Sequence, residues 1–404
     1  AGLGFLKWTD ARHRRLCLII PITVDLLLLG FFKYAGFFLG SLQGLAHLWG
    51  AELAIPVLHI VLPVGISFYT FHTITYIVDS YRGTIRPTRN LFEFAAYVSL
   101  FSQLVAGPIV RFRQIEEDLE NLAHADRTRW LRRGLMFFVL GMIEKVVVAD
   151  SLASFVDPAL ADYRALSSLG AWLAMLGYTF QLYFDFAGYS DMAVGLGFLF
   201  GIRIPQNFNS PYKSTDPSDF WRRWHISLSS CLRDYLYIPL GGNRNGAFQT
   251  YRNLVLTMLI GGLWHGANWT FVVWGAYHGL ILGVYRSVAE SWDRLSSGLR
   301  RTATFLAVVV GWVFFRAADF TMALDLLHKM FWPVYDGVVP ADLGWFLVAL
   351  LFAGTWAMLG PNVFDIDARL KWRREYGIVL AGLAGCALAV MSGAGSSPFL
   401  YFQF

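Results

Sequence analysis

The sequence predicts an all-α, polytopic integral membrane protein that forms one domain over residues 1–404. Of the 404 residues, 56% are hydrophobic and only 15% are charged, and the mean hydropathy is +0.48. A soluble domain carries about 25% charged residues, so the composition excludes an ordinary soluble protein. The apolar residues also gather into runs of about 20 residues, the length of a helix that crosses roughly 30 Å of hydrocarbon.

Apolar runs long enough to span a bilayer recur along the whole chain. Each run lacks the density of charged residues that a soluble helix carries on its outer face. We therefore expect seven spanning helices, joined by polar connections. They lie near residues 17–39, 53–78, 131–149, 169–188, 303–318, 342–360 and 376–393.

Lys and Arg are distributed unevenly among the connections, and this asymmetry orients the spans because basic loops stay in the cytoplasm. Residues 40–52 and 392–404 contain no Lys or Arg. Placing the basic connections inside makes the seven spans alternate without contradiction and leaves the C-terminal tail outside. The basic connections are 7–15, 82–89, 111–133, 203–252, 286–301 and 369–374.

Two further apolar stretches, 91–110 and 252–287, begin and end on the cytoplasmic side in this scheme. Each is expected to be a two-helix hairpin or a re-entrant segment. Irregular backbone at membrane depth is tolerated only where protein or a cavity surrounds it. In the second stretch, His265 lies at the Gly-Ala-Asn break between the two halves.

The net charge of +5 is explained by basic cytoplasmic loops, and nucleic acid is not an expected partner. The three cysteines, Cys17, Cys231 and Cys386, have no spacing typical of a metal site, and we expect neither a metal nor a bound cofactor. The chain begins at Ala1, and additional N-terminal hydrophobic segments are expected to precede it.

His265 is the ionisable residue of greatest interest, because it lies inside the apolar stretch from Leu254 to Val284. Ionisable groups at bilayer depth are costly and usually functional, and a neutral imidazole can act as a general base. The alternatives are a histidine hydrogen-bonded within a helix bundle and a proton-relay residue of a transporter. For His72 and His278, also in apolar surroundings, a structural role is preferred.

Residues 216–240 predict an amphipathic helix on the cytoplasmic side. Asp216 and Pro217 form a helix start signal. Two interpretations stay open: an interfacial helix whose arginines contact lipid phosphates, or a site that holds an anionic donor bearing phosphopantetheine. The polar face carries Arg222, His225, Ser229 and Arg233, and the apolar face carries Phe220, Trp224, Leu228, Cys231 and Tyr235.

Three long motifs give the chain a family resemblance. They are Phe220 to Ser229, Leu232 to Arg244, and Gly262 to Trp269. Together they resemble the membrane-bound O-acyltransferase family, and within it the bacterial members that acetylate exopolysaccharides. The resemblance covers nearly the whole chain, including Gln181 to Asp191 and Ser397 to Phe404. It implies a helical bundle with a central tunnel.

The resemblance also implies roles for individual residues. His265 matches the family's catalytic histidine and would act as general base, while His225, at the cytoplasmic mouth, matches the second signature position. Arg222 and Arg233 would contact the donor, either acetyl-CoA or an acyl-carrier thioester. Asn268, or a backbone N–H at the Gly266 break, would stabilise the oxyanion. The acceptor is expected to be an exopolysaccharide, with alginate favoured over cellulose and peptidoglycan.

The C-terminal tail, residues 396–404, resembles an acylation motif of bacterial members that export acyl groups. Tyr401 is then a relay acceptor, and an aromatic interfacial anchor is the alternative. The implied setting is a bacterial inner membrane, with a periplasmic acetyltransferase of an SGNH-like type, a polysaccharide secretion complex and membrane lipid as partners. The rival functions are a proton-coupled transporter or channel for an acyl donor or saccharide, and a scaffold that recruits a secretion complex.

Overall fold

A computed structural model describes residues 1–53, 60–104, 107–124, 127–393 and 400. Within these residues the chain is helical, and extended structure is confined to a single parallel bridge between Leu166 and Val338. The all-α prediction is confirmed. Contacts within the chain group it into two compact units, residues 1–125 with 202–204, and residues 126–201 with 205–404, and the single integral-membrane domain stays a prediction.

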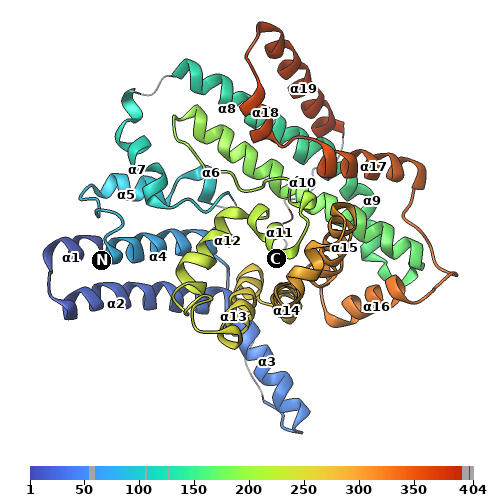
Figure 1. Cartoon of the computed structure of the whole chain (residues 1–404), viewed down its shortest axis with the longest axis horizontal. Helices are drawn as coiled ribbons and strands as arrows, with labels where there is room; N and C mark the ends of the chain where they lie inside the picture. The colour runs from blue at the N-terminus through green and yellow to red at the C-terminus, as the bar shows by residue number, and fades with distance from the viewer. Residues whose placement is uncertain (54–59, 105–106, 125–126, 394–399, 401–404) are drawn as a thin grey trace. The chain divides into compact units, whose positions relative to one another are not determined.

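The first unit contains a long apolar helix that runs without interruption from Ala11 to Leu48 through a π-helical turn. Large apolar side chains such as Leu27 and Phe38 are exposed along it, as expected of a helix that faces lipid. In this unit α2 packs against α4 (Figure 1). The helices are α1 Gly2–Lys7, α2 Ala11–Leu29, η1 Gly30–Tyr34, α3 Ala35–Leu48, α4 Ile66–Arg82, α5 Leu91–Val98, α6 Phe101–Leu104, α7 Phe112–Glu120 and η2 Leu122–His124.

Aromatic side chains form the core of the first unit. Tyr76 and Tyr97 each meet Phe112 edge to face, with ring centroids 5.2 and 5.3 Å apart. The fully buried His72 ring lies 5.5 Å from that of Tyr97, in agreement with the structural role expected for it. Residues 202–204 join this unit through Arg203, whose Nε donates to Asp118 Oδ1 at 2.8 Å.

The second unit is built around α10, a helix whose central residues 177–188 are all buried. At about 1.5 Å per residue its 32 residues extend about 48 Å. The helices are α8 Arg127–Met142, η3 Ile143–Ala149, α9 Asp150–Ala161, η4 Tyr163–Ala165, α10 Ser168–Leu199, η5 Pro211–Lys213, α11 Pro217–Arg223, α12 Ile226–Leu232, η6 Arg233–Tyr237, α13 Ala247–His265, α14 Trp269–Asp293, α15 Ser297–Arg316, α16 Phe320–Phe331, α17 Leu343–Leu359, α18 Val363–Arg369 and α19 Arg374–Gly393.

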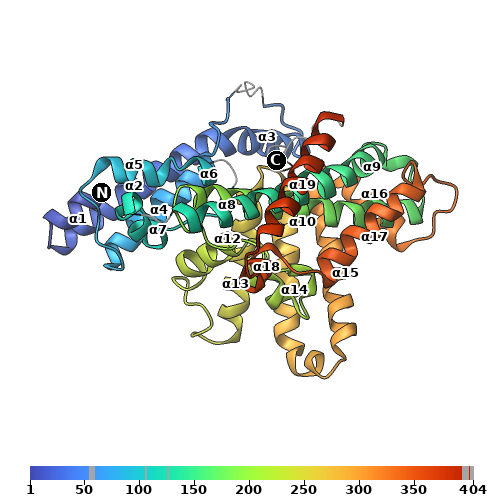
Figure 2. The same ribbon diagram turned by 90° about the horizontal axis from the view of Figure 1, so that it is seen from above.

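Helices α8, α9, α15, α16 and α17 pack around α10 (Figure 1). The backbones of α8 and α10 approach so closely that a Cβ at Gly188 would overlap the Gly141 carbonyl oxygen. In Figure 2, α14 and α15 run alongside each other, joined by a short turn. This packing encloses the apolar residues of α10 without using a sheet.

The predicted spans coincide with helices, but not every one of these helices has the length and composition of a membrane span. By length and composition three described helices suit a membrane span, Ala11–Leu48, α15 and α19, and the bent pair α17 and α18 would add a fourth. The spans expected near 131–149 and 169–188 correspond to α8 with η3 and to α10. The span expected near 53–78 is helical from Ile66, and residues 54–59 lie outside the described part.

Two local predictions have different outcomes. Residues 252–287 form the expected hairpin, α13 and α14, with a break at Gly266 to Asn268. Residues 216–240 do not form one continuous helix: they form α11 and α12, each of seven residues, and then the π-helical turn η6. The helix start is as expected, because Asp216 accepts a hydrogen bond from the Asp219 amide at 2.7 Å and Pro217 follows it.

Candidate active site

The α13–α14 hairpin places His265 at its turn. His265 is the last residue of α13, and Gly266 continues the chain in an extended conformation. The two helices touch backbone to backbone, since a Cβ at Gly262 would overlap the Phe271 carbonyl oxygen and one at Gly275 would overlap that of Met258. The position of His265 is therefore fixed by two close helix contacts rather than by a loop.

The His265 ring is 5% exposed and is surrounded by aromatic side chains. Its centroid lies 5.1 Å from Trp264, 5.1 Å from Trp274 and 5.2 Å from Phe315, in edge-to-face arrangements. The aromatic rings limit the water that reaches the imidazole from these sides, and a general base is most effective where water does not compete for its proton. The location supports the role predicted from the sequence.

His225 lies at the break between α11 and α12, two helices too short to span a bilayer. Its φ of 44° lies in the left-handed region, and this conformation turns the chain between the helices. The ring is fully buried, and Nδ1 lies 3.1 Å from Asn207 Oδ1. Burial lowers the pKa of the His225 imidazole to about 3, so the ring is neutral at physiological pH.

The two histidines predicted from the sequence are close neighbours, with ring centroids 6.3 Å apart. They differ in access. His265 lines a pocket of about 600 Å³, whereas His225 is sealed behind it and does not line the pocket. The prediction that His225 stands at the mouth is therefore wrong, because the break at His225 turns its ring inward instead of leaving it on a polar helix face.

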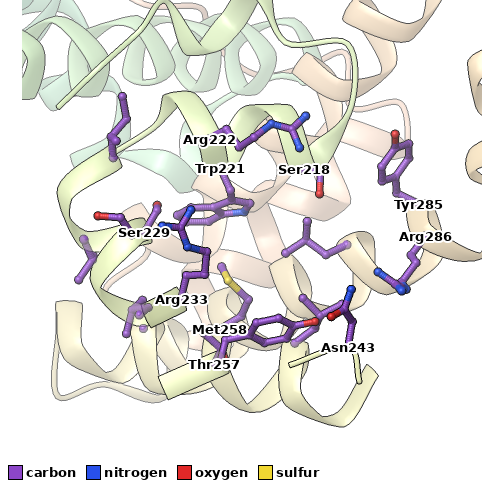
Figure 3. A pocket seen from close by; sticks show the side chains of 18 of the residues that line it. Ser218, Trp221, Arg222, Ser229, Arg233, Asn243, Thr257, Met258, Tyr285 and Arg286 are labelled. Atoms are coloured by element: carbon purple, nitrogen blue, oxygen red, sulfur yellow. The ribbon is translucent and has the colours of Figure 1, made fainter. Parts of the chain in front are cut away.

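The pocket connects His265 with charged residues at the surface of the second unit. Trp221 projects into it, and Arg233 and Arg286 lie on opposite sides (Figure 3). Arg222 and Arg233 are 66% and 63% exposed, and each pairs with an acidic neighbour, Asp219 and Asp234 respectively. The pocket thus has a cationic rim and a histidine in its buried part.

Arg286 was not predicted from the sequence. It lies on α14, lines the same pocket, and has no carboxylate partner among the described residues. On the sequence it belongs to the basic connection 286–301, and nothing there connects it to Arg222 or Arg233. Only the fold of the α13–α14 hairpin brings it beside η6.

Asn207 is a second residue that sequence reasoning missed. Its Oδ1 accepts hydrogen bonds from the Ser227 amide at 3.2 Å and the Ser227 hydroxyl at 2.9 Å, besides its contact with His225. Its amide group donates to Ser190 Oγ at 3.1 Å. A lone asparagine eighteen residues before a histidine carries no periodic signal, so no sequence pattern could have indicated this contact.

Two indole groups line the pocket with unused donors. The Nε1 atoms of Trp221 and Trp274 are buried and have no acceptor among the described residues. Buried donors are normally satisfied, so these N–H groups are available to a bound molecule. Trp274 is the closer to the chemistry, because its ring touches His265.

Asn268, predicted to bind the oxyanion, is placed differently. Its Oδ1 caps α14 by accepting from the Thr270 amide at 3.1 Å, and its Nδ2 donates to the Ala318 carbonyl oxygen at 2.8 Å. It does not line the pocket. Both ends of its amide are used to hold the hairpin, so Trp274 is the better candidate donor.

Tyr401 lies outside the described residues. The neighbouring Leu400 is described, and it is buried, with its amide donating to Asp185 Oδ2 at 3.0 Å. The other oxygen of Asp185 pairs with Lys145 at 2.7 Å. Asp185 is therefore held by an ion pair and by a backbone hydrogen bond, and no cluster of three metal-ligating side chains occurs among the residues described.

Comparison with known proteins identifies the class to which this fold and pocket belong. Residues 80–322 match the model of MBOAT, the membrane-bound O-acyltransferase family, which is more than half of the chain. The chain belongs to the membrane-bound O-acyltransferase family. It is accordingly a multi-pass membrane protein and an O-acyltransferase.

Named relatives share much of the sequence. The chain is 44% identical over 413 residues to "Probable alginate O-acetylase AlgI" of Pseudomonas putida, covering 96% of this chain and 84% of the relative. It is 49% identical over 316 residues to the Pseudomonas aeruginosa protein of that name, covering 78% and 60%. It is 40% identical over 347 residues to "Peptidoglycan O-acetyltransferase" of Helicobacter pylori, covering 79% and 65%.

Proposed function

We propose that this protein is an O-acetyltransferase of a bacterial inner membrane that moves acetyl groups from a cytoplasmic thioester towards an exopolysaccharide, alginate in the first place. The observation that carries the proposal is the pocket in which a buried histidine, His265, lies beneath a rim of three arginines. The names of the relatives support the substrate class. Cellulose and peptidoglycan are the alternative polymers.

In the proposed reaction an acceptor hydroxyl attacks the thioester carbonyl carbon. The imidazole of His265 accepts the hydroxyl proton as the new C–O bond forms. The C–S bond then breaks, and the proton passes to the departing sulfur, which leaves as a free thiol. After the attack and before the C–S bond breaks, the former carbonyl oxygen carries a negative charge. The indole N–H of Trp274 is the proposed hydrogen-bond donor to that oxygen.

The cationic rim selects the donor. Arg222, Arg233 and Arg286 suit the phosphates of a phosphopantetheine-bearing molecule. Both acetyl-CoA and an acylated carrier protein present such a group. The basic connection 203–252 supports a cytoplasmic location for this rim.

The acceptor side is proposed from the tail. Tyr401 would receive the acetyl group and pass it to a periplasmic SGNH-like acetyltransferase attached to a polysaccharide secretion complex. In support, Leu400, the residue before Tyr401, is buried, and its amide donates a hydrogen bond to Asp185 of α10. Tyr401→Phe keeps the aromatic ring and removes the nucleophile, so the relay requires that this variant abolish acetylation of the polymer.

The test of the function uses purified protein in proteoliposomes with labelled acetyl-CoA or labelled acetyl-carrier protein. Thiol release and label transfer are measured for the wild type, His265→Gln and His72→Gln. We expect His265→Gln to lower turnover by about 10²–10⁴-fold, the usual contribution of a general base. His72 is a fully buried imidazole of the first unit that does not line the pocket, and its variant should keep wild-type turnover.

The same preparation separates the rival functions. A proton-coupled transporter would show flux that depends on a proton gradient, with no release of thiol. A scaffold would release no thiol even as the wild type, and in cells both histidine variants would keep polymer acetylation. Full turnover by correctly folded His265→Gln, verified by size-exclusion chromatography, would show that the proposed mechanism is wrong.

A further inference from the structure

A second cavity of the second unit, of about 700 Å³, lies between α8 and α19 and shares no residue with the pocket of His265. We refer to it as the α8–α19 groove. Its charged end is lined by Arg132, Arg373 and Arg374, and its apolar part by residues such as Leu135, Val139 and Leu380. The groove is therefore amphipathic along its length.

The three arginines of the groove have no carboxylate partner in the part of the chain that the structure describes. The neighbouring Arg133, by contrast, forms an ion pair with Asp367 at 2.5 Å. The side chains of Arg132, Arg373 and Arg374 are exposed. Three guanidiniums gathered at one end without acids form a site for an anion, and phosphate is the anion that guanidinium recognises best.

The apolar part of the groove follows two parallel stripes. Arg132, Leu135 and Val139 lie three and four residues apart and so share one face of α8. On α19, Arg374, Gly377 and Leu380 share a face in the same way. At about 1.5 Å per residue these stripes extend about 10 Å or more beyond the charged end, which suits a hydrocarbon chain lying between two helices.

The surface around the groove suits lipid rather than water. α19 is apolar and long enough to span a bilayer, and its outer side chains Ile378, Leu388 and Met391 are 78%, 58% and 52% exposed. The arginines belong to the basic connections 111–133 and 369–374, both assigned to the cytoplasmic side by their charge. A ligand here would hold its head group at that membrane surface.

We propose that the α8–α19 groove binds an anionic glycerophospholipid, with its phosphate against Arg132, Arg373 and Arg374 and an acyl chain along Leu135, Val139 and Leu380. A zwitterionic lipid presents a compensating ammonium to the same arginines and binds more weakly. A free phosphate gains nothing from the apolar stripes. The site is independent of the acyl-transfer reaction.

Native mass spectrometry of the full-length chain, released from detergent with equal amounts of phosphatidylglycerol and phosphatidylethanolamine, tests this site. The wild type should retain one molecule of phosphatidylglycerol in preference to phosphatidylethanolamine. Replacement of all three arginines by Gln should lower that retention roughly one hundred-fold, at about five-fold for each cationic contact. Gln at Arg15, Arg294 and Arg301, exposed arginines elsewhere, removes the same charge and should have no effect.

A matched pair of glycine variants tests the apolar part. A Cβ at Gly377 or at Gly382 meets no atom within 4 Å, so both positions are open at the backbone, but only Gly377 lines the groove. Gly377→Leu should therefore displace the lipid and Gly382→Leu should not. Three results would each overturn the proposal. The arginine triple variant could retain as much phosphatidylglycerol as the wild type, or the wild type could retain as much phosphatidylethanolamine as phosphatidylglycerol. Glycerol phosphate could also be retained as strongly as the lipid.

Discussion

His265 and His225 are neighbouring buried imidazoles with different surroundings. His265 lines a pocket among aromatic rings, whereas His225 is fully enclosed and lies against Asn207. The sequence indicated both residues through a family resemblance. The sequence prediction placed His225 on the polar face of one continuous helix. The left-handed backbone at His225 breaks that helix in two.

We predict that Asn207 and His225 act as one unit. Asn207→Leu removes the acceptor of the Ser227 donors and of the His225 ring. The free energy of unfolding should fall by about 1–3 kcal/mol for each buried group left unpaired. Turnover per folded molecule should fall as well, because the His225 ring lies beside the His265 ring and helps to position it. In a double-mutant cycle with His225→Gln, thiol release should show a coupling of about 0.5–3 kcal/mol.

Asn209 provides the control for that cycle. It lies two residues away, and its side chain contacts Asn362 rather than His225. Asn209→Leu combined with His225→Gln should give additive effects. Additive effects in the Asn207 cycle would mean that Asn207 has no positioning role.

The α13–α14 hairpin is the element that creates the site. The sequence predicted this hairpin from the charge of the flanking connections and from the Gly-Ala-Asn break. The sequence did not predict how tightly its two helices pack, because the close approach at Gly262 and Gly275 depends on the register of the two helices. The same contact brings Arg286 to the rim, which explains why that residue was missed.

We predict that Gly262→Ala separates the two helices and displaces His265. Overpacking at such a contact costs about 1–3 kcal/mol, and the thermal midpoint and thiol release should fall together. Gly298→Ala is the matched control, since its Cβ meets no atom within 4 Å. Unchanged turnover in stable Gly262→Ala would show that the hairpin contact does not position the histidine.

Across the whole chain, composition and charge predicted the fold class and the location of most helices correctly. Hydrophobic runs are local properties, and so they can be found without knowing the fold. The pocket is not local: Trp221, Met258 and Arg286 come from different helices and meet only after folding. The two indole donors at Trp221 and Trp274 carry no sequence signal for the same reason.

The cationic rim should govern donor affinity. Gln at Arg222, Arg233 and Arg286 together is expected to raise the KM for acetyl-CoA about ten-fold, since exposed charges contribute up to about 1 kcal/mol each and are screened by salt. The KM for acetyl-pantetheine, which has no phosphate, should not change. The variant with Gln at Arg15, Arg294 and Arg301 serves as the charge control, and a rise there of the same size would reject a specific role for the rim.

The structure of the protein with a non-hydrolysable acetyl-CoA analogue tests the central claim most directly. Our account predicts that the acetyl group lies within hydrogen-bond distance of His265 and Trp274, with the pantetheine arm beside Met258 and the phosphates at Arg222, Arg233 and Arg286. An analogue bound with its acetyl group away from His265, or bound outside this pocket at saturating concentration, would contradict the account.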